Sequence, residues 1–248
     1  MKINGELGKV LSTSPEHRQW NCGMGIFKPG VVYWEEDPEG RVIIDGKRCK
    51  ILSKADYYSK SYINIGGKNY KTVKIANKVW LAENLAYVWE GLTRDIAPNG
   101  DTPVYIETAF EEGGLFYNEI ALDYLVKHPE LLPDGWRVPT RRDFETVIAS
   151  TGLTTDPKTL VVPNNYIEEG FPLDFGGTND YGFNGLPLGS YVGSNLNYNS
   201  VVAWWTSTKV TPGDDDSYYY LLRMTSSAFA YPSYTWSNRY NIRLVKDA

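Results

Sequence analysis

The sequence is poor in the residues on which most catalytic and metal sites depend. Its 248 residues include two cysteines, Cys22 and Cys49, and two histidines, His17 and His128. Two cysteines without CxxC spacing are too few for a disulfide scaffold, so we expect buried thiols, although the two could also pair with each other. A histidine metal site or a Ser-His-Asp triad would need one of the two histidines, and His128 lies at a predicted helix end. We therefore expect no enzyme, no catalytic residue and no cofactor.

Long apolar runs and an excess of positive charge are also absent. No segment approaches the roughly 20 apolar residues that a membrane helix needs, so no membrane insertion is expected. The net charge of −5 and the pI of about 5.2 argue against a nucleic-acid partner. The first ten residues lack the apolar stretch of a signal peptide, which favours folding in the cytoplasm. A removed signal peptide would leave the same sequence, so that alternative stays open.

Aromatic residues are abundant. The chain has 8 Trp, 19 Tyr and 8 Phe, which together make up 14% of the residues. Tyr and Trp combine an apolar ring with a polar group, so they suit half-exposed binding surfaces. Aromatic residues also favour β-strands, so a β-rich fold would explain the same composition.

The first quarter of the chain predicts a small β-meander. Strand-like runs at residues 31–34, 41–44 and 47–52 are separated by turn sequences, among them Asp45-Gly46. Such short strands bury too little apolar surface to be stable alone. We therefore expect residues 1–65 to form an attachment or oligomerisation segment that packs on the main domain or on other chains.

The remaining residues, 66–248, predict a single α+β domain. Alternating apolar and polar residues at 70–75 and 79–85 indicate a hairpin, and apolar positions on one face of 117–126 indicate a helix. From residue 153 onward, short strands and glycine-rich loops are expected. Helices followed by a loop-rich β half are typical of the α+β class.

A second helix is expected after Pro139. Thr140 is a candidate N-cap, and Asp143 three positions later resembles a capping box, although Glu or Gln is the usual residue there. Gly152 is expected to end this helix.

Six landmarks in a fixed order carry a resemblance to a known family. They are the hairpin at 70–85 and the segments 114–118, 132–140, 179–187, 203–208 and 240–247. In this order they resemble the Fibrobacter succinogenes major paralogous domain. The sequence Gly-Trp-Arg-Val-Pro-Thr is the most specific of them. The last landmark departs from the family, because Leu244 stands where members often carry cysteine.

The resemblance implies a C-type-lectin-like fold, in which two helices flank a twisted antiparallel sheet with long loops. That fold is related to formylglycine-generating enzymes and to variable receptor-binding proteins of phages. The enzymes use paired cysteines in the C-terminal half, and no cysteine follows Cys49 here. The resemblance also implies structural roles for six landmark residues. Bulky core anchors or fixed turns are expected at Trp80, Trp136, Pro139, Phe183 and Trp205. Arg137 is expected to form a buried ion pair or to clamp a carbonyl group. Glu83 and Asn84 are expected to tie the hairpin to the sheet.

The stretch 217–240 is the strongest candidate for a ligand surface. It has eight aromatic residues, no acidic residue and many Ser and Thr, a mixture that is typical of antibody binding surfaces. Strand alternation must direct about half of its aromatic side chains inward. Together with the amides of the loop 194–200, this stretch predicts a surface that binds a protein or a sugar. The predicted contact residues are Tyr198, Asn199, Tyr218, Tyr220, Tyr231, Tyr234, Trp236, Asn238 and Tyr240.

One acidic run could hold a metal ion. Asp214, Asp215 and Asp216 are consecutive, and calcium prefers clustered carboxylate oxygens. No further carboxylate spacing supports a site, so a solvated turn is the preferred interpretation.

These observations predict a non-enzymatic binding or display protein. We expect a bacteriophage virion component, such as a tail or head fibre or its receptor-binding tip, that recognises a host cell-surface receptor or glycan. The N-terminal segment would contact other virion proteins, and the chain would form a homo-oligomer, with a trimer as one form. The alternative is a secreted adhesin or glycan-binding protein on the bacterial cell surface.

Overall fold

Three sheets and two α-helices make up the part of the chain that the structure describes. The computed structural model describes residues 2–3, 6–7, 19–21, 31–44, 46–52, 61–94, 102–108, 113–151, 157–163, 175–192, 195–197, 201–211, 218–233 and 238–248. Within these residues the architecture is α+β with mostly antiparallel strands, as the sequence predicts.

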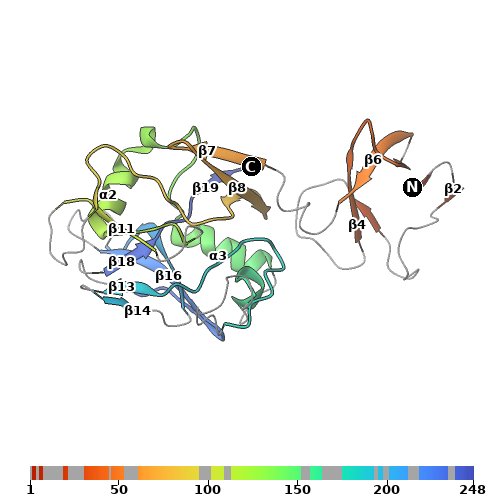
Figure 1. Cartoon of the computed structure of the whole chain (residues 1–248). Coiled ribbons are helices and arrows are strands. Elements are labelled where there is room, and N and C mark those ends of the chain that lie inside the picture. The colour runs from red at the N-terminus through yellow and green to blue at the C-terminus, as the bar shows by residue number, and fades with distance from the viewer. Residues whose placement is uncertain are drawn as a thin grey trace.

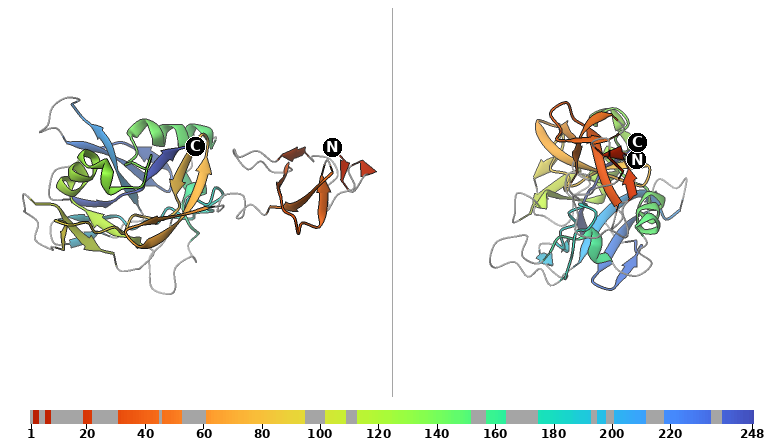
Figure 2. Two further views of the ribbon diagram at one scale, coloured as in Figure 1. Left: turned by 90° about the horizontal axis from the view of Figure 1, so that it is seen from above. Right: turned by 90° about the vertical axis from the view of Figure 1, so that its right-hand side faces the viewer.

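The N-terminal sheet has six short strands in the order β2-β1-β5-β6-β4-β3. They are β1 (Lys2–Ile3), β2 (Glu6–Leu7), β3 (Gln19–Asn21), β4 (Val31–Glu36), β5 (Val42–Ile44) and β6 (Lys47–Ile51). Figure 2 shows these strands gathered as a group of their own. Among the side chains of this sheet that the structure describes, the buried core consists of Trp34, Val42, Ile44 and Cys49. The predicted strands are confirmed, but they do not form a meander, because β4 and β5 both pair with β6 and not with each other. Cys49 is buried, whereas Cys22 lies outside the described residues.

A four-stranded sheet joins the two ends of the main body. Its strands are β7 (Ser61–Ile65), β8 (Lys68–Ile75), β9 (Lys78–Leu81) and β19 (Val245–Asp247), in the order β19-β9-β8-β7. The predicted hairpin corresponds to β8 and β9, and Figure 1 shows the C-terminal strand β19 close to the orange hairpin strand β8. β7 pairs with β8 along its whole length, so it belongs with the main body, although the sequence predicts it in the N-terminal segment.

The largest sheet has nine strands. Seven strands follow the order β10-β11-β12-β18-β15-β16-β17. Outside this order, β13 pairs with both β18 and β14. The strands are β10 (Thr93–Arg94), β11 (Val104–Glu107), β12 (Leu115–Tyr117), β13 (Ser190–Val192), β14 (Asn195–Asn197), β15 (Val202–Lys209), β16 (Tyr219–Thr225), β17 (Ala228–Ala230) and β18 (Asn238–Asn241). β15 and β16 form its longest pair and carry the centre of the core.

The two α-helices are α2 (Glu119–Lys127) and α3 (Arg141–Ser150), with short 3-10 turns at η3 (Pro129–Leu131) and η4 (Pro157–Leu160). The Asn118 side chain caps α2 by accepting from the N–H of Ala121. The Thr140–Asp143 capping box of α3 is confirmed, and Thr151 follows the helix as its C-cap. Within the described residues, no helix is long and apolar enough to cross a membrane.

The two helices cover opposite faces of the large sheet. Trp205, paired with Leu221, lies in a core cluster with Leu122 of α2. The neighbouring Trp204 lies in a second cluster with Phe144 of α3. Successive strand residues point to opposite faces, so each helix packs on its own side of β15 and β16.

The landmark residues have the structural roles that the sequence predicts. Trp80, Trp136, Phe183 and Trp205 are almost fully buried. Trp205 also donates from its indole N–H to the carbonyl of Tyr117 at 2.8 Å. These side chains therefore build the scaffold and are not available for direct contact with a ligand.

The prediction that Glu83 and Asn84 tie the hairpin to the sheet is confirmed for Asn84. Glu83 Oε1 accepts from the N–H of Lys71 at 3.2 Å, and because Lys71 belongs to β8, this bond lies within the hairpin. The buried Asn84 donates to the carbonyl of Gly113 and accepts from the indole N–H of Trp204. The hairpin and β15 are thereby held in one fixed arrangement.

Candidate ligand-binding surface

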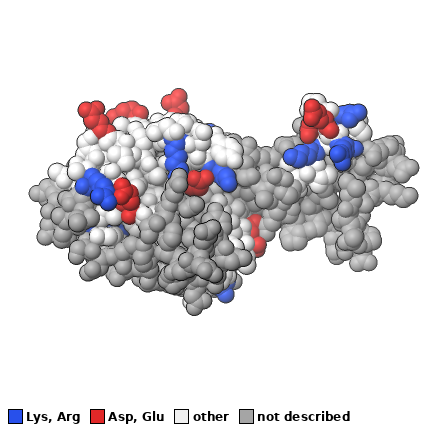
Figure 3. Space-filling view, in the orientation of Figure 1, with Lys and Arg blue, Asp and Glu red and all other residues white. Residues whose placement is uncertain are grey.

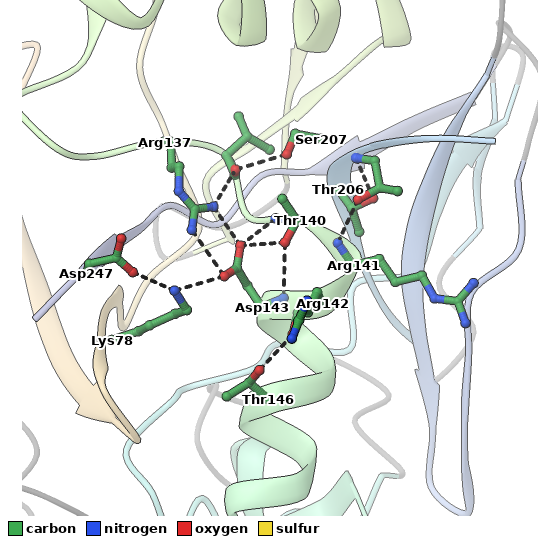
Figure 4. A network of polar contacts seen from close by, with 12 residues as sticks. Lys78, Arg137, Thr140, Arg141, Arg142, Asp143, Thr146, Thr206, Ser207 and Asp247 are labelled. Carbon is green, nitrogen blue, oxygen red and sulfur yellow. Dashed lines mark hydrogen bonds and ion pairs between the residues drawn. The ribbon is translucent and has the colours of Figure 1, made fainter. Parts of the chain in front are cut away.

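The N-terminus of α3 is fixed by a network around Asp143. Its carboxylate accepts from Arg137 at 2.6 and 3.1 Å and from the Thr140 N–H at 2.7 Å, and it lies 3.1 Å from the Lys78 ammonium. Figure 4 shows these groups enclosing the carboxylate, while the side chain of Arg141 extends away from them. Burial alone would raise the pKa of Asp143, but the bonds from Arg137 and Thr140 hold it well below its usual range.

The same network explains the role of Arg137. The sequence predicts an arginine ion pair or carbonyl clamp, and the bidentate pair with Asp143 confirms the ion pair. The Arg137 side chain remains partly exposed, so only the carboxylate partner is buried. The first turn of α3 is thereby anchored. Arg141, which follows Thr140, points outward from the network.

Arg141 is held between two tyrosines of the large sheet. Its guanidinium carbon lies 4.7 Å from the ring centroid of Tyr231 and 5.3 Å from that of Tyr220. Its Nε donates to Glu145 at 2.8 Å, and its backbone N–H donates to the hydroxyl of Thr208 at 3.0 Å. Cation–π contacts and an ion pair therefore hold a half-exposed guanidinium in one orientation.

Strand register explains why these tyrosines meet. Arg223 of β16 pairs with Ala230 of β17, and a bridge further on pairs Tyr220 with Ser233. Tyr220 and Tyr231 are therefore diagonal neighbours on the face that α3 covers. Tyr218 is two residues before Tyr220 and 36% exposed. We call Tyr218, Tyr220, Tyr231 and Arg141 the Tyr–Arg surface.

The neighbouring tyrosine of β16 faces the other side of the sheet. Tyr219 is buried, and its hydroxyl donates to Asp123 of α2 at 2.6 Å. Strand alternation therefore separates a tyrosine that anchors α2 from the tyrosines that form the surface.

The comparisons with known proteins identify the main body. The family model described as the Fibrobacter succinogenes major domain matches residues 73–246, which is more than half of the chain. The chain belongs to this family. Neither the curated proteins nor the solved structures contain a match. The matched residues of the family domain extend from within β8 to β19 and include the Tyr–Arg surface.

Two of the predicted contact residues are buried in the family domain. Asn238 and Tyr240 of β18 are buried, and the Asn238 amide donates to the Tyr240 hydroxyl at 3.2 Å. The Tyr240 ring packs edge-on against Trp205, with 5.0 Å between ring centroids. Their predicted place on a ligand surface is therefore wrong, because Tyr240 lies in the core cluster with Trp205 and Asn238 is buried beside it.

The other predicted contact residues divide into two groups. Tyr220 and Tyr231 are half-buried and lie together against Arg141, and strand alternation places the exposed Tyr218 on the same face. The remaining four lie outside the described residues; they are Tyr198, Asn199, Tyr234 and Trp236. Sequence reasoning missed Arg141, which is distant in the chain and joins the tyrosines only through the packing of α3 on β16.

The family domain has an unpaired hydroxyl at this surface. Burial raises the pKa of Tyr231, and its buried hydroxyl has no hydrogen-bond partner. An unpaired buried hydroxyl costs about 1–3 kcal/mol. The ring of Tyr231 therefore contributes contacts to Arg141, whereas its hydroxyl adds no bond to the residues that the structure describes.

The residues that the structure describes contain no cluster of three or more His, Cys, Asp or Glu side chains that could hold a metal ion. Asp214, Asp215 and Asp216 lie outside those residues, so the calcium site remains a sequence-based prediction. On the face drawn in Figure 3, acidic and basic side chains of the described residues are intermixed. The described residues of this face therefore produce no wide field of one sign.

Glu119 predicts a pH dependence of stability. Burial raises its pKa to about 7, although the N–H of Tyr219 donates to its carboxylate at 3.0 Å. Because burial favours the protonated form of Glu119 in the folded chain, this side chain stabilises the fold at pH values below its pKa in the unfolded chain. The contribution is lost as the pH rises through about 7. Glu119→Gln should therefore raise the free energy of unfolding by about 1 kcal/mol at pH 8, after discounting for solvent screening, and change it little at pH 5.

Urea titrations at the two pH values measure this difference. The exposed Glu90→Gln is the control, and an equal effect of Glu119→Gln at both pH values would contradict the prediction.

Proposed function

We propose that the chain is a non-enzymatic binding and display protein whose family domain has a C-type-lectin-like fold. The pairing of β19 with β9 supports this fold, because it brings the two ends of the domain together. The placement of α2 and α3 on opposite faces of a central antiparallel sheet supports it as well. Such a scaffold keeps its core residues apart from the residues that contact a ligand.

The observation that carries the proposal is the fixed geometry of the Tyr–Arg surface. Arg141 is held by two tyrosine rings and by Glu145, so a ligand would not have to order it. Tyrosine rings lose little side-chain entropy on binding and offer both apolar and polar contact. Preorganised Tyr and Arg residues of this kind are the residues that dominate binding energy in protein interfaces.

The chemistry of this surface fits a glycan or a protein receptor on a cell surface. An exposed tyrosine ring can stack on the C–H face of a sugar, while hydroxyl groups bind polar neighbours. Nη1 and Nη2 of Arg141 can donate together to a carboxylate, as on an acidic sugar or an acidic side chain. We therefore propose a ligand that combines an apolar face with an acceptor group.

The biological setting that we propose is a bacteriophage virion, with the N-terminal sheet as the attachment to other virion proteins. Recognition of a host receptor would then occur at the family domain. A bacterial surface adhesin would use the same surface. Mass spectrometry separates the two: detection of the chain in purified phage particles supports the virion, and detection in the cell envelope supports the adhesin.

Removal of a ring from the Tyr–Arg surface should weaken ligand binding. Tyr220→Ala and Tyr231→Ala each remove a ring that orients Arg141, and we expect each to weaken binding at least about tenfold. Tyr231→Phe keeps the ring and should bind like the wild type. Fluorescently labelled protein on a glycan array and on host cells measures the effect. Unchanged binding by both alanine variants would contradict the proposed site.

A further inference from the structure

Among the strands that the structure describes, β7 is a sheet edge without the usual protection against pairing. It is last in the order β19-β9-β8-β7, and its sequence Ser-Tyr-Ile-Asn-Ile has neither charge nor proline. Natural edge strands usually carry lysine, proline or a bulge, because a bare edge pairs with another strand. The edge segment after β17 has such protection, since Pro232 lies opposite Leu221 there.

The β7–β8 turn determines which backbone groups of β7 are free to pair. Gly66 and Gly67 form a two-residue turn with φ of 58° and 87°, which favours glycine at both positions. The residues that flank such a turn, Ile65 and Lys68, form a hydrogen-bonded pair. Hydrogen-bonded and non-hydrogen-bonded pairs then alternate along an antiparallel ladder.

This alternation directs the N–H and C=O groups of Tyr62 and Asn64 away from β8. Tyr62 is paired with Lys71 in the register. The carbonyl of Lys71 accepts from the N–H of Ala82, so Lys71 is bonded toward the other side of β8. Tyr62 therefore occupies a non-hydrogen-bonded position, and its backbone groups line the outer edge.

The side chains of β7 show that the strand is already fixed in place. Ile65 is buried, and Ile63 packs against the main core. Tyr62 is 63% exposed, the highest value among the large apolar and aromatic side chains of the described residues, and Asn64 is exposed on the same face. A partner strand would therefore meet an ordered edge with one apolar and one polar face.

We propose that β7 pairs antiparallel with β7 of a second copy of this chain, across a two-fold axis at Ile63. In this register Ile63 lies opposite the partner's Ile63, and Tyr62 lies opposite the partner's Asn64. The apolar side chains of both copies then share the core face, and roughly four backbone hydrogen bonds form between the strands. The pairing uses both free edges, so it closes at two chains.

A second copy fits this edge because the edge is complementary to itself. It has no charge, so two copies meet without like-charge repulsion and without needing a complementary sequence. The partly buried Ile63 meets its counterpart on the core face, and the exposed Tyr62 meets an exposed Asn64 on the other face.

The pairing does not rest on the proposed ligand-binding role, and either could fail without the other. A five-residue edge buries less than the roughly 1,200 Å² of a standard stable interface, so the dimer should be weak. We expect a dissociation constant on the order of 10–100 μM.

Sedimentation equilibrium of the full chain tests the proposal, with Tyr62→Pro and Tyr62→Ala as matched variants. Tyr62→Pro removes an outward N–H and no bond within the sheet, so the fold should persist while the dissociation constant rises at least about tenfold. Tyr62→Ala keeps the N–H and should dimerise within about threefold of the wild type. Circular dichroism checks that both variants fold. A wild-type chain that stays monomeric, forms a trimer, or dimerises equally well as Tyr62→Pro would overturn the proposal.

Discussion

Replacing Arg243 with alanine is expected to lower the free energy of unfolding of the family domain by about 4–6 kcal/mol. Arg243 is fully buried, and its Nη atoms donate to the carbonyls of Leu81 and Phe183 and to Asn84 Oδ1. A fourth bond reaches the carbonyl of Asn184. One guanidinium therefore joins three segments that are far apart in sequence. Alanine would leave these acceptors without donors and open a cavity, and both changes are costly.

Graded variants separate the guanidinium geometry of Arg243 from its charge. Arg243→Lys keeps the charge but cannot reach the same acceptors, so we expect a loss of about 2–4 kcal/mol. Arg223→Ala, at a half-buried arginine of β16, is the control and should cost about 1 kcal/mol or less. Urea unfolding followed by tryptophan fluorescence measures all three. A loss below about 1 kcal/mol for Arg243→Ala would show that the buried network does not stabilise the domain.

The second large effect is expected at Asp143. Asp143→Asn removes the negative charge that Arg137 and Lys78 share, and we expect a loss of about 3–5 kcal/mol at pH 7. The pKa of Asp143 is lowered in the fold, so its contribution is fully present above the unfolded pKa and is lost as the pH falls toward the folded value. The difference between wild type and variant should therefore shrink steadily below about pH 4.

Urea titrations of Asp143→Asn at pH 7, 5 and 3 follow this dependence. The exposed Asp134→Asn is the matched control, because its carboxylate lies in the loop before Arg137 and outside the network. It should change the free energy of unfolding by about 0.5 kcal/mol or less. A loss for Asp143→Asn that is the same at pH 7 and pH 3 would contradict the assignment of its stabilising effect to the carboxylate.

The scaffold could be predicted from the sequence because its determinants are local or ordered along the chain. The capping box of α3 depends on residues three positions apart, and the β8–β9 hairpin depends on alternation and a two-residue turn. The ordered family landmarks predict core positions for Trp80 and Trp205, and both side chains are buried. The sequence assigns β7 to the N-terminal segment, because composition alone does not separate this strand from the short strands before it.

The Tyr–Arg surface could be predicted only in part, because it depends on which face of a strand points outward. The tyrosine-rich composition identifies the stretch that contains β16. Strand register, however, decides that Tyr220 faces Arg141 while Tyr219 faces Asp123. Tyr240 belongs to the same tyrosine-rich stretch and is buried because its ring packs against Trp205 in the core. Arg141 could not be assigned from the sequence, since its contact with the tyrosines arises from tertiary packing alone.

The central claim is that the family domain binds its ligand through the Tyr–Arg surface, and two adjacent arginines test it most directly. Arg141 lies against Tyr220 and Tyr231, whereas its neighbour Arg142 is exposed on α3. Binding of labelled Arg141→Ala and Arg142→Ala to host cells or to the glycan identified on the array should be compared with the wild type. The account predicts that Arg141→Ala weakens binding about tenfold or more and that Arg142→Ala stays within about twofold. Equal binding by the two variants would contradict it.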